Sequence, residues 1–335
     1  MDMRKLGRSG LSVSPLCLGT MMFGDRTDEK EARRIIDHAR DAGVNFIDTA
    51  DQYGKGRSEE IVGRAVAKDR DAWVIATKAG NLVNDTHANN QGLSRKWLLK
   101  AMDDSLSRLK LDCVDIWYLH LDDYTTPLEE AVSAVADVLG QGKALYWGVS
   151  NFRAWRICEL VHLAEAAGID RPIVCQPYYN AMNRMPEVEI LPACEYHGLG
   201  VVPYSVLARG VLTGKYQPGK APPKETRAGR QDKRMMQTEF REESLLIAQK
   251  LQKHAEAKGM TVADFAINWV LANPIVTSVL AGPRTLEQWQ GYLSALDHGF
   301  DEEDERLLDS LVATGHPSTP GYSDPSYPIT GRPVW

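Results

Sequence analysis

The sequence predicts an α/β protein that forms one (β/α)8 TIM barrel domain over residues 1–335. Eight short apolar runs follow one another from residue 16 to about residue 295, each nearly continuous, as in parallel strands that are buried on both faces. Amphipathic stretches with helical period separate these runs. A doubly wound sheet is the alternative, but no predicted strand is followed by a GxGxxG turn. These observations favour the barrel.

The elements follow in a regular order. In the stretch DEKEARRIIDHARDAG, the side chains of Ala32, Ile35, Ile36 and Ala39 share one helical face, and a glycine ends the pattern. The stretch SRKWLLKAMDDSLSRL begins at Ser94, a residue type that caps helix N-termini. The predicted strands are residues 16–20 (LCLGT), 45–50 (NFIDTA), 73–78 (WVIATK), 114–120 (VDIWYLH), 144–150 (ALYWGVS), 174–180 (VCQPYYN), 200–206 (GVVPYSV) and 278–282 (SVLAG).

Three segments fall outside this alternation. Residues 3–13 surround a GRSG turn and are predicted to form a hairpin that caps the bottom of the barrel. Residues 215–241, after the seventh strand, carry eight basic and three acidic side chains, and form either a solvated insertion or a lid over a bound anion. Residues 315–335 hold five prolines and cannot be helical. The aromatic residues Tyr322, Tyr327 and Trp335 indicate packing of this tail, with disorder as the alternative.

Composition excludes several classes of protein. The net charge of −6 disfavours nucleic-acid binding, which needs a basic surface. The five cysteines show no CxxC spacing, which favours a reducing, cytoplasmic setting. The N-terminal segment has no apolar signal core, and no stretch approaches eighteen apolar residues, so neither secretion nor membrane spanning is expected.

Four polar side chains lie at the ends of consecutive predicted strands. Asp48 lies at the end of the second strand and Tyr53 follows it, Lys78 ends the third strand and His120 ends the fourth. In a barrel of this kind, the carboxyl ends of the strands surround one mouth, so these side chains should converge. Each residue taken alone has an ordinary structural interpretation, such as a turn cap, a rim aromatic, a solvated lysine or a core histidine. Their joint position favours a catalytic site.

These four residue types suit the reduction of a carbonyl group. A phenol with a pKa near ~10 is a weak acid at neutral pH, and a nearby Lys78 ammonium is expected to lower the pKa of Tyr53. Asp48 would hold Lys78 through a charge-assisted hydrogen bond, and His120 would donate to the substrate oxygen. No HExxH or paired-ligand spacing is present, so no metal is expected.

The segments FIDTADQYG, WVIATK and SLSRLKLDCVDIWYLH resemble signatures of the aldo-keto reductases, as do GVSNF, PYSVLARGVLTGKY and AGPRTLEQ. The resemblance extends from Arg4 to about residue 312. It implies a (β/α)8 barrel, an NADPH cofactor bound without a Rossmann motif, and a catalytic tetrad of Asp48, Tyr53, Lys78 and His120. The implied reaction is hydride transfer between NADPH and an aldehyde or ketone, or from the alcohol to NADP+.

The resemblance also implies contacts with the cofactor. Tyr204 would stack on the nicotinamide, and Arg284 would bind the adenosine 2′-phosphate. The full implied set is Gly19, Thr20 and Met21 beside the ribose, Ser150, Asn151 and Gln176 at the carboxamide, Tyr204 on the nicotinamide ring, Ser205, Leu207, Arg209, Gly210 and Lys215 along the pyrophosphate, and Gly282, Arg284 and Gln288 at the adenosine, together with Asp48. Tyr292 stands where the family commonly has asparagine, so NADH use with lower affinity is compatible with the sequence.

Two other functions stay open. A branch of this family resembles ion-channel regulatory subunits that bind NADPH, so a non-catalytic role is possible. An unrelated barrel enzyme could use Lys78 as a Schiff-base amine. The substrate mouth is expected to be lined by Met22, Phe23, residues 79–93, residues 122–124, and the lid or tail. Apolar side chains there suit an aldehyde or ketone, whereas Asn81, Asn84, Asp85 and Asn89 suit a sugar.

Overall fold

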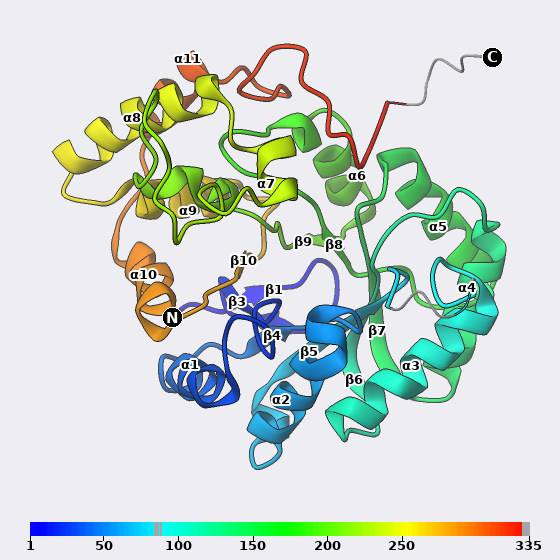
Figure 1. The fold of residues 1–335 in the computed structure, drawn as a ribbon. Helices are drawn as coiled ribbons and strands as arrows, with labels where there is room; N and C mark the ends of the chain where they lie inside the picture. Colours follow the sequence, from blue (N-terminus) through cyan, green and yellow to red (C-terminus); the bar gives the residue numbers. More distant parts are fainter. Residues whose placement is uncertain (84–86, 88, 330–335) are drawn as a thin grey trace.

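The computed structural model describes residues 1–83, 87 and 89–329, and it contains the predicted barrel (Figure 1). Eight parallel strands form one sheet in the order β10-β3-β4-β5-β6-β7-β8-β9. The two outer strands meet, because Thr277 N donates to Val201 O (2.8 Å) and Leu280 N donates to Pro203 O (3.0 Å). The sheet is therefore curled into a closed barrel, with helices on its outer side.

Each strand lies in or beside its predicted run, most are shorter than predicted, and the sixth and seventh are shortened most. The sixth and seventh predicted strands end before Pro177 and Pro203, because proline has no N–H for strand pairing. The isolated bridge between Tyr178 and Tyr204 continues their alignment. The barrel strands are β3 (Leu16–Gly19), β4 (Phe46–Asp48), β5 (Val74–Ala79), β6 (Val114–Leu119), β7 (Ala144–Ser150), β8 (Val174–Gln176), β9 (Gly200–Val201) and β10 (Val279–Ala281).

The helices alternate with the strands and bury the apolar faces that the sequence indicates. In α1 the predicted face of Ala32, Ile35, Ile36 and Ala39 is buried. The Ser94 hydroxyl caps α3 by accepting from Trp97 N, as predicted. The α-helices are α1 (Glu29–Asp41), α2 (Arg57–Val66), α3 (Arg95–Leu109), α4 (Leu128–Gly140), α5 (Ala154–Ala166), α6 (Ile190–His197), α7 (Lys233–Thr238), α8 (Glu242–Ala257), α9 (Val262–Ala272), α10 (Leu286–Ser294) and α11 (Glu302–Leu311). The 3-10 turns are η1 (Tyr53–Gly56), η2 (Arg70–Ala72), η3 (Met185–Glu187), η4 (Ala208–Thr213) and η5 (Ala295–Asp297).

The N-terminal hairpin closes the bottom of the barrel, as predicted. Strands β1 (Arg4–Lys5) and β2 (Ser12–Val13) pair antiparallel. Leu6 and Val13 are fully buried and belong to the inner core, where they join strand residues such as Cys17 and Phe46. Their apolar side chains exclude water from the barrel interior at the end opposite the strand carboxyl ends. None of the helices in the described part of the chain has the length and apolar character needed to cross a membrane.

The proline-rich tail packs on the barrel over its described part, residues 315–329. Asp324 forms an ion pair with Arg234 of α7, and the Arg241 guanidinium lies 3.9 Å from the ring centroid of Tyr322. The Arg153 side chain donates to Tyr327 O at 2.8 Å. Figure 1 shows this segment in red, passing beside α7. The tail is thus anchored above the mouth of the barrel, whereas Trp335 lies outside the described residues.

The contact between α2 and α3 yields a stability prediction. A Cβ on Gly63 would lie 2.0 Å from the Leu109 carbonyl oxygen, whereas a Cβ on Gly140 would meet nothing within 4 Å. Gly63→Ala should lower the free energy of unfolding by about 1–3 kcal/mol, because the backbone must shift. Gly140→Ala, at the last residue of α4, should change it by less than about 1 kcal/mol, in the stabilising direction. Urea unfolding of both variants measures this difference, and equal effects would contradict the packing argument.

Candidate active site

The four predicted tetrad residues meet at the carboxyl ends of the strands. Asp48 is the last residue of β4, and Tyr53 begins η1, the next element after that strand. Lys78 lies near the end of β5 and His120 follows β6. The register of neighbouring strands sets the position of these residues along the barrel axis, since Asp48 pairs with Ala76 and Lys78 pairs with Tyr118. The convergence expected from strand order is therefore observed.

Lys78 is the centre of the cluster. Its ammonium donates to the Asp48 carboxylate, to Thr49 O at 2.8 Å and to the Tyr53 hydroxyl at 3.4 Å. The side chains of Lys78 and Asp48 are both 0% exposed. A buried ion pair of this kind is retained only when each charge is well satisfied. The three acceptors leave Lys78 no free N–H direction toward the cavity.

The net pKa shift of Tyr53 differs from the sequence prediction. Burial raises the pKa of Tyr53, and the Lys78 ammonium lowers it only in part. Desolvation disfavours the phenolate more strongly than one nearby cation favours it. For Lys78, burial lowers the pKa, but Asp48 and Tyr53 outweigh burial and raise it overall. Both groups therefore hold their protons at neutral pH.

His120 faces Tyr53 at the edge of the cavity. The two ring centroids are 5.9 Å apart and the ring planes are nearly perpendicular. Burial, and then Lys78, lower the pKa of His120 well below its ordinary value. His120 is consequently a neutral imidazole at physiological pH, able to donate one hydrogen bond. Its Nδ1 atom is buried and has no hydrogen-bond partner among the described residues.

A set of side-chain amides and hydroxyls connects the cluster to the neighbouring strands. Gln176 donates to Asp48 Oδ2 (2.9 Å), and Ser150 Oγ donates to Gln176 O (2.9 Å). Asn151 donates to His120 O at 2.9 Å and accepts from the Tyr204 hydroxyl at 2.7 Å. These bonds fix the side chains before any ligand binds, which is the preorganisation that an active site requires.

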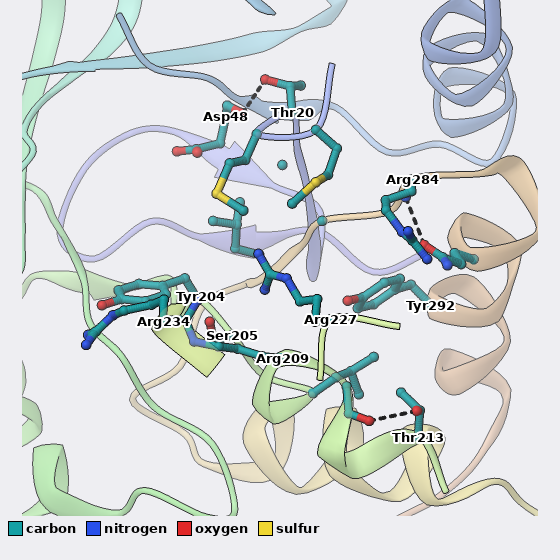
Figure 2. Close-up of a pocket in the computed structure, with 18 of the residues that line it drawn as sticks. Thr20, Asp48, Tyr204, Ser205, Arg209, Thr213, Arg227, Arg234, Arg284 and Tyr292 are labelled. Carbon is teal, nitrogen blue, oxygen red and sulfur yellow. Dashed lines mark hydrogen bonds between the residues drawn. The ribbon is translucent and has the colours of Figure 1, made fainter. Parts of the chain in front are cut away.

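A cavity of about 740 Å³ extends from the cluster along the mouth of the barrel. This volume lies within the range of small-molecule sites. All the implied cofactor residues line it, together with Tyr53 and His120, whereas Lys78 is covered by them. The lining residues from the predicted set are Gly19, Thr20, Met21, Asp48, Tyr53, His120, Ser150, Asn151, Gln176, Tyr204, Ser205, Leu207, Arg209, Gly210, Lys215, Gly282, Arg284 and Gln288. Ten of the cavity residues are labelled in Figure 2.

The cavity wall away from the cluster is cationic. Figure 2 shows Arg209, Arg227 and Arg284 around the same space. Burial lowers the pKa of Arg227, and the nearby Arg209 lowers it further. The Arg209 Nε atom is buried without a partner among the described residues. Guanidiniums held close together with unused donors fit a phosphorylated ligand, which would relieve their repulsion and satisfy the donor.

The backbone around this wall is locally strained. Asn151, Ser205 and Arg209 have left-handed backbone conformations, with φ of 61°, 58° and 51°. Such conformations cost about 1–3 kcal/mol each in residues other than glycine and cluster at functional sites. All three residues line the cavity. Their strain therefore marks this cavity as a functional site, from Asn151 beside the cluster to Arg209 on the cationic wall.

The residues at the far end of the cavity are held by the start of α10. The Thr285 side chain caps this helix, and Arg284 N donates to Gln288 Oε1 at 2.9 Å. Arg284 thus lies at a helix N-terminus, where the helix dipole also favours an anion. Tyr292 lines the same end, and burial raises its pKa to about 12.

The expected substrate mouth is only partly correct. Met22 and Asn81 line the cavity, but Phe23 is fully buried in the outer core. The loop 122–124 does not reach the cavity in the described structure, because Asp122 binds Arg156 through both carboxylate oxygens and Tyr124 is exposed. Asn89 also lies elsewhere, and Asn84 and Asp85 fall outside the described residues.

Sequence reasoning missed several lining residues. The basic composition of residues 215–241 pointed to Arg227 and Arg234, but it could not select them from their neighbours. Lys220, Lys224 and Arg230 are exposed, so this segment is part solvated insertion and part cavity wall. The missed residues are Arg26, Gln52, Thr213, Thr226, Arg227, Arg234, Thr261, Ala263, Asp264, Leu280, Gly291, Ser294 and Tyr327.

The fold and the site define an oxidoreductase of the barrel class, and the sequence comparisons agree. The family model of the aldo/keto reductases matches residues 15–313. The chain belongs to the aldo/keto reductase family, whose members act on small molecules and generally use NAD(P)H.

The similar proteins include potassium channel subunits and oxidoreductases. A probable voltage-gated potassium channel subunit beta of Arabidopsis thaliana is 39% identical over 302 residues, covering 89% of this chain and 92% of that protein. An uncharacterized oxidoreductase of Bacillus subtilis is 36% identical over 330 residues, covering 96% of this chain and 98% of that protein. An L-glyceraldehyde 3-phosphate reductase of Escherichia coli is 35% identical, covering 94% of this chain and 93% of that protein.

Proposed function

We propose that this protein is an NADPH-dependent carbonyl reductase in which Tyr53 is the general acid. The observation that carries the proposal is the junction of two features in one cavity. The Asp48–Lys78–Tyr53 cluster and His120 lie at one end, and the guanidiniums of Arg209, Arg227 and Arg284 line the rest. The first feature suits proton delivery to an alkoxide, and the second suits a phosphorylated dinucleotide.

The chain's own residues would hold and orient both reactants. The bound cofactor supplies the hydride. Tyr204 would fix the nicotinamide face, while Ser150, Asn151 and Gln176 would bind its carboxamide. This last role requires Gln176 to share or exchange its present bond to Asp48. Binding of this kind supplies proximity, which is a large part of the rate enhancement in two-substrate reactions.

Proton transfer completes the reduction. The hydride would add to the carbonyl carbon, and the Tyr53 O–H bond would break to form the alcohol O–H bond. The Lys78 ammonium would stabilise the resulting phenolate, and Asp48 would keep Lys78 charged and in place. The neutral His120 would donate a hydrogen bond to the carbonyl oxygen and position it. Alcohol oxidation would use the same groups in reverse.

The two alternative functions lead to different observations. The relatives named as potassium channel subunits favour a regulatory NADPH-binding protein, whereas measurable turnover would favour the reductase. A Schiff-base mechanism conflicts with the burial of Lys78 and with its three oxygen acceptors. We therefore expect borohydride to trap no substrate on Lys78.

Turnover screening tests the proposal directly. A panel of aldehydes, ketones and sugars, including triose phosphates because of one relative's name, should be assayed with NADPH and with NADH. We expect reduction of at least one carbonyl class, with NADPH preferred. A protein that binds NADPH tightly but reduces none of the panel would support the regulatory alternative.

Cofactor choice is predicted to depend on Arg284. Arg284→Ala should raise the Kd of NADPH by about ten- to a hundredfold, because one charge-assisted contact to the 2′-phosphate is lost. The Kd of NADH, which lacks that phosphate, should hardly change. Fluorescence titration measures both constants.

The control for Arg284 is Arg306→Ala, which removes an exposed arginine on α11 that pairs with Glu302. This variant should bind both cofactors normally. Equal weakening of NADPH and NADH in the Arg284 variant would show that another cation reads the phosphate, with Lys215, Arg209 and Arg227 as the next candidates.

A further inference from the structure

A buried carboxylate lies behind the wall of the cavity. Glu239 follows α7 directly and is 0% exposed. The Tyr178 hydroxyl donates to Glu239 Oε1. Neither residue is among the described lining of the cavity. Neither Tyr178 nor Glu239 has a role in the proposed hydride and proton transfer, although burying a carboxylate is costly.

Tyr178 connects this carboxylate to the proposed nicotinamide site. The rings of Tyr178 and Tyr204 are stacked, with centroids 5.6 Å apart and an interplanar angle of 28°. The backbone holds them together, since Tyr204 N donates to Pro177 O at 3.0 Å. Tyr204 faces the cavity and Tyr178 does not. The order from interior to cavity is therefore Glu239, Tyr178, Tyr204.

The negative charge of the pair resides on Glu239. Burial, and then Glu239, raise the pKa of Tyr178 well above its ordinary value, so Tyr178 remains a hydrogen-bond donor. Burial also raises the pKa of Glu239, but the Tyr178 hydroxyl and the guanidiniums of Arg209 and Arg241 oppose that rise. The Arg241 guanidinium also lies over the ring of Tyr322. Burial outweighs these groups, so the pKa of Glu239 is raised overall. The Tyr178 donor and the two guanidiniums are the groups that stabilise its ionised form.

We propose that Glu239 is a positioning residue that makes the site prefer the oxidised cofactor, NADP+, over NADPH. This inference rests on the proposed nicotinamide position against Tyr204. The oxidised ring carries a positive charge and the reduced ring does not, so a negative charge held at the edge of the aromatic stack attracts only the oxidised form. During carbonyl reduction the ring becomes cationic, and Glu239 stabilises that change.

Cofactor titration of Glu239→Gln tests the inference without a substrate. The Kd of NADP+ should rise about tenfold, because one unit charge near the ring is lost in a partly buried site. The Kd of NADPH should change by less than about threefold, because its nicotinamide ring is neutral. Its phosphates are the same as those of NADP+, so any effect on them acts equally on both cofactors. The ratio of the two constants isolates the ring charge, which a purely structural role would leave unchanged.

Glu225→Gln is the matched control, because it removes the same charge from an exposed position in the same segment. It should leave the ratio unaltered. Where Glu239→Gln fails to fold, Tyr178→Phe serves instead, since it keeps the stacked ring and removes the donor that stabilises the carboxylate. The ratio should then shift in the same direction by a smaller factor.

Two outcomes would overturn the inference. In one, both constants rise equally in Glu239→Gln, which would assign Glu239 to anchoring the segment after α7. In the other, the ratio stays constant in both the Glu239 and the Tyr178 variants. Failure of the parent protein to bind either cofactor would instead refute the proposed function, so the two failures are distinguishable.

Discussion

Replacement of Tyr53 by phenylalanine is expected to lower kcat for carbonyl reduction by about 10²–10⁴-fold, the usual contribution of a positioned general acid. The ring and its contact with His120 remain, and only the transferable proton and the acceptor for Lys78 are lost. The Kd of NADPH should stay nearly constant, because it depends mainly on the arginines along the cavity. Steady-state kinetics and cofactor titration measure the two effects separately.

The matched control is Tyr124→Phe, the same substitution at an exposed tyrosine outside the cavity lining. It should keep normal turnover. Near-normal kcat in Tyr53→Phe would remove Tyr53 from the proposed role.

Because burial raises the pKa of Tyr53, the protonated form persists to higher pH. The reduction rate of the parent protein should therefore be flat through neutral pH and fall only on the alkaline side.

Replacement of Lys78 by methionine should lower kcat by about a hundredfold or more, because the phenolate of Tyr53 loses its stabilising cation. The same change should reduce the free energy of unfolding by about 3–5 kcal/mol, since the Asp48 carboxylate stays buried without its partner. Activity assays and urea unfolding measure these two losses.

A double variant separates the two effects of Lys78. Asp48→Asn combined with Lys78→Met removes both buried charges, so most of the lost stability should return. Turnover should stay low, because no ammonium faces Tyr53. Recovery of turnover together with stability would mean that Lys78 serves the fold alone and has no role in proton transfer.

The barrel was predictable because its strands are buried on both faces. A strand such as β6 (Val114–Leu119) needs apolar side chains at nearly every position, so its run stands out from amphipathic helices. The limits of β8 and β9 were less predictable. Their sequences stay apolar beyond the last paired residue, and pairing ends where Pro177 and Pro203 lack the donor.

The convergence of the four cluster residues was predictable from strand order alone. Asp48, Lys78 and His120 come from adjacent parallel strands, and the barrel brings the carboxyl ends of such strands to one face. The side chains that reach the cavity from residues 215–241 and from the tail were not predictable in this way. Arg227 and Tyr327 lie on irregular segments, where no period indicates which side chain points inward.

The sequence by itself determined the order of strands and helices, the positions of the four cluster residues, and the family to which the chain belongs. Only the tertiary structure decided the net pKa shift of Tyr53, the burial of Phe23 and the stacking of Tyr178 on Tyr204. Local pattern follows from hydrophobic period along the chain. A pKa or a ring contact instead depends on the distance and burial of groups that are remote in sequence, and folding alone sets these.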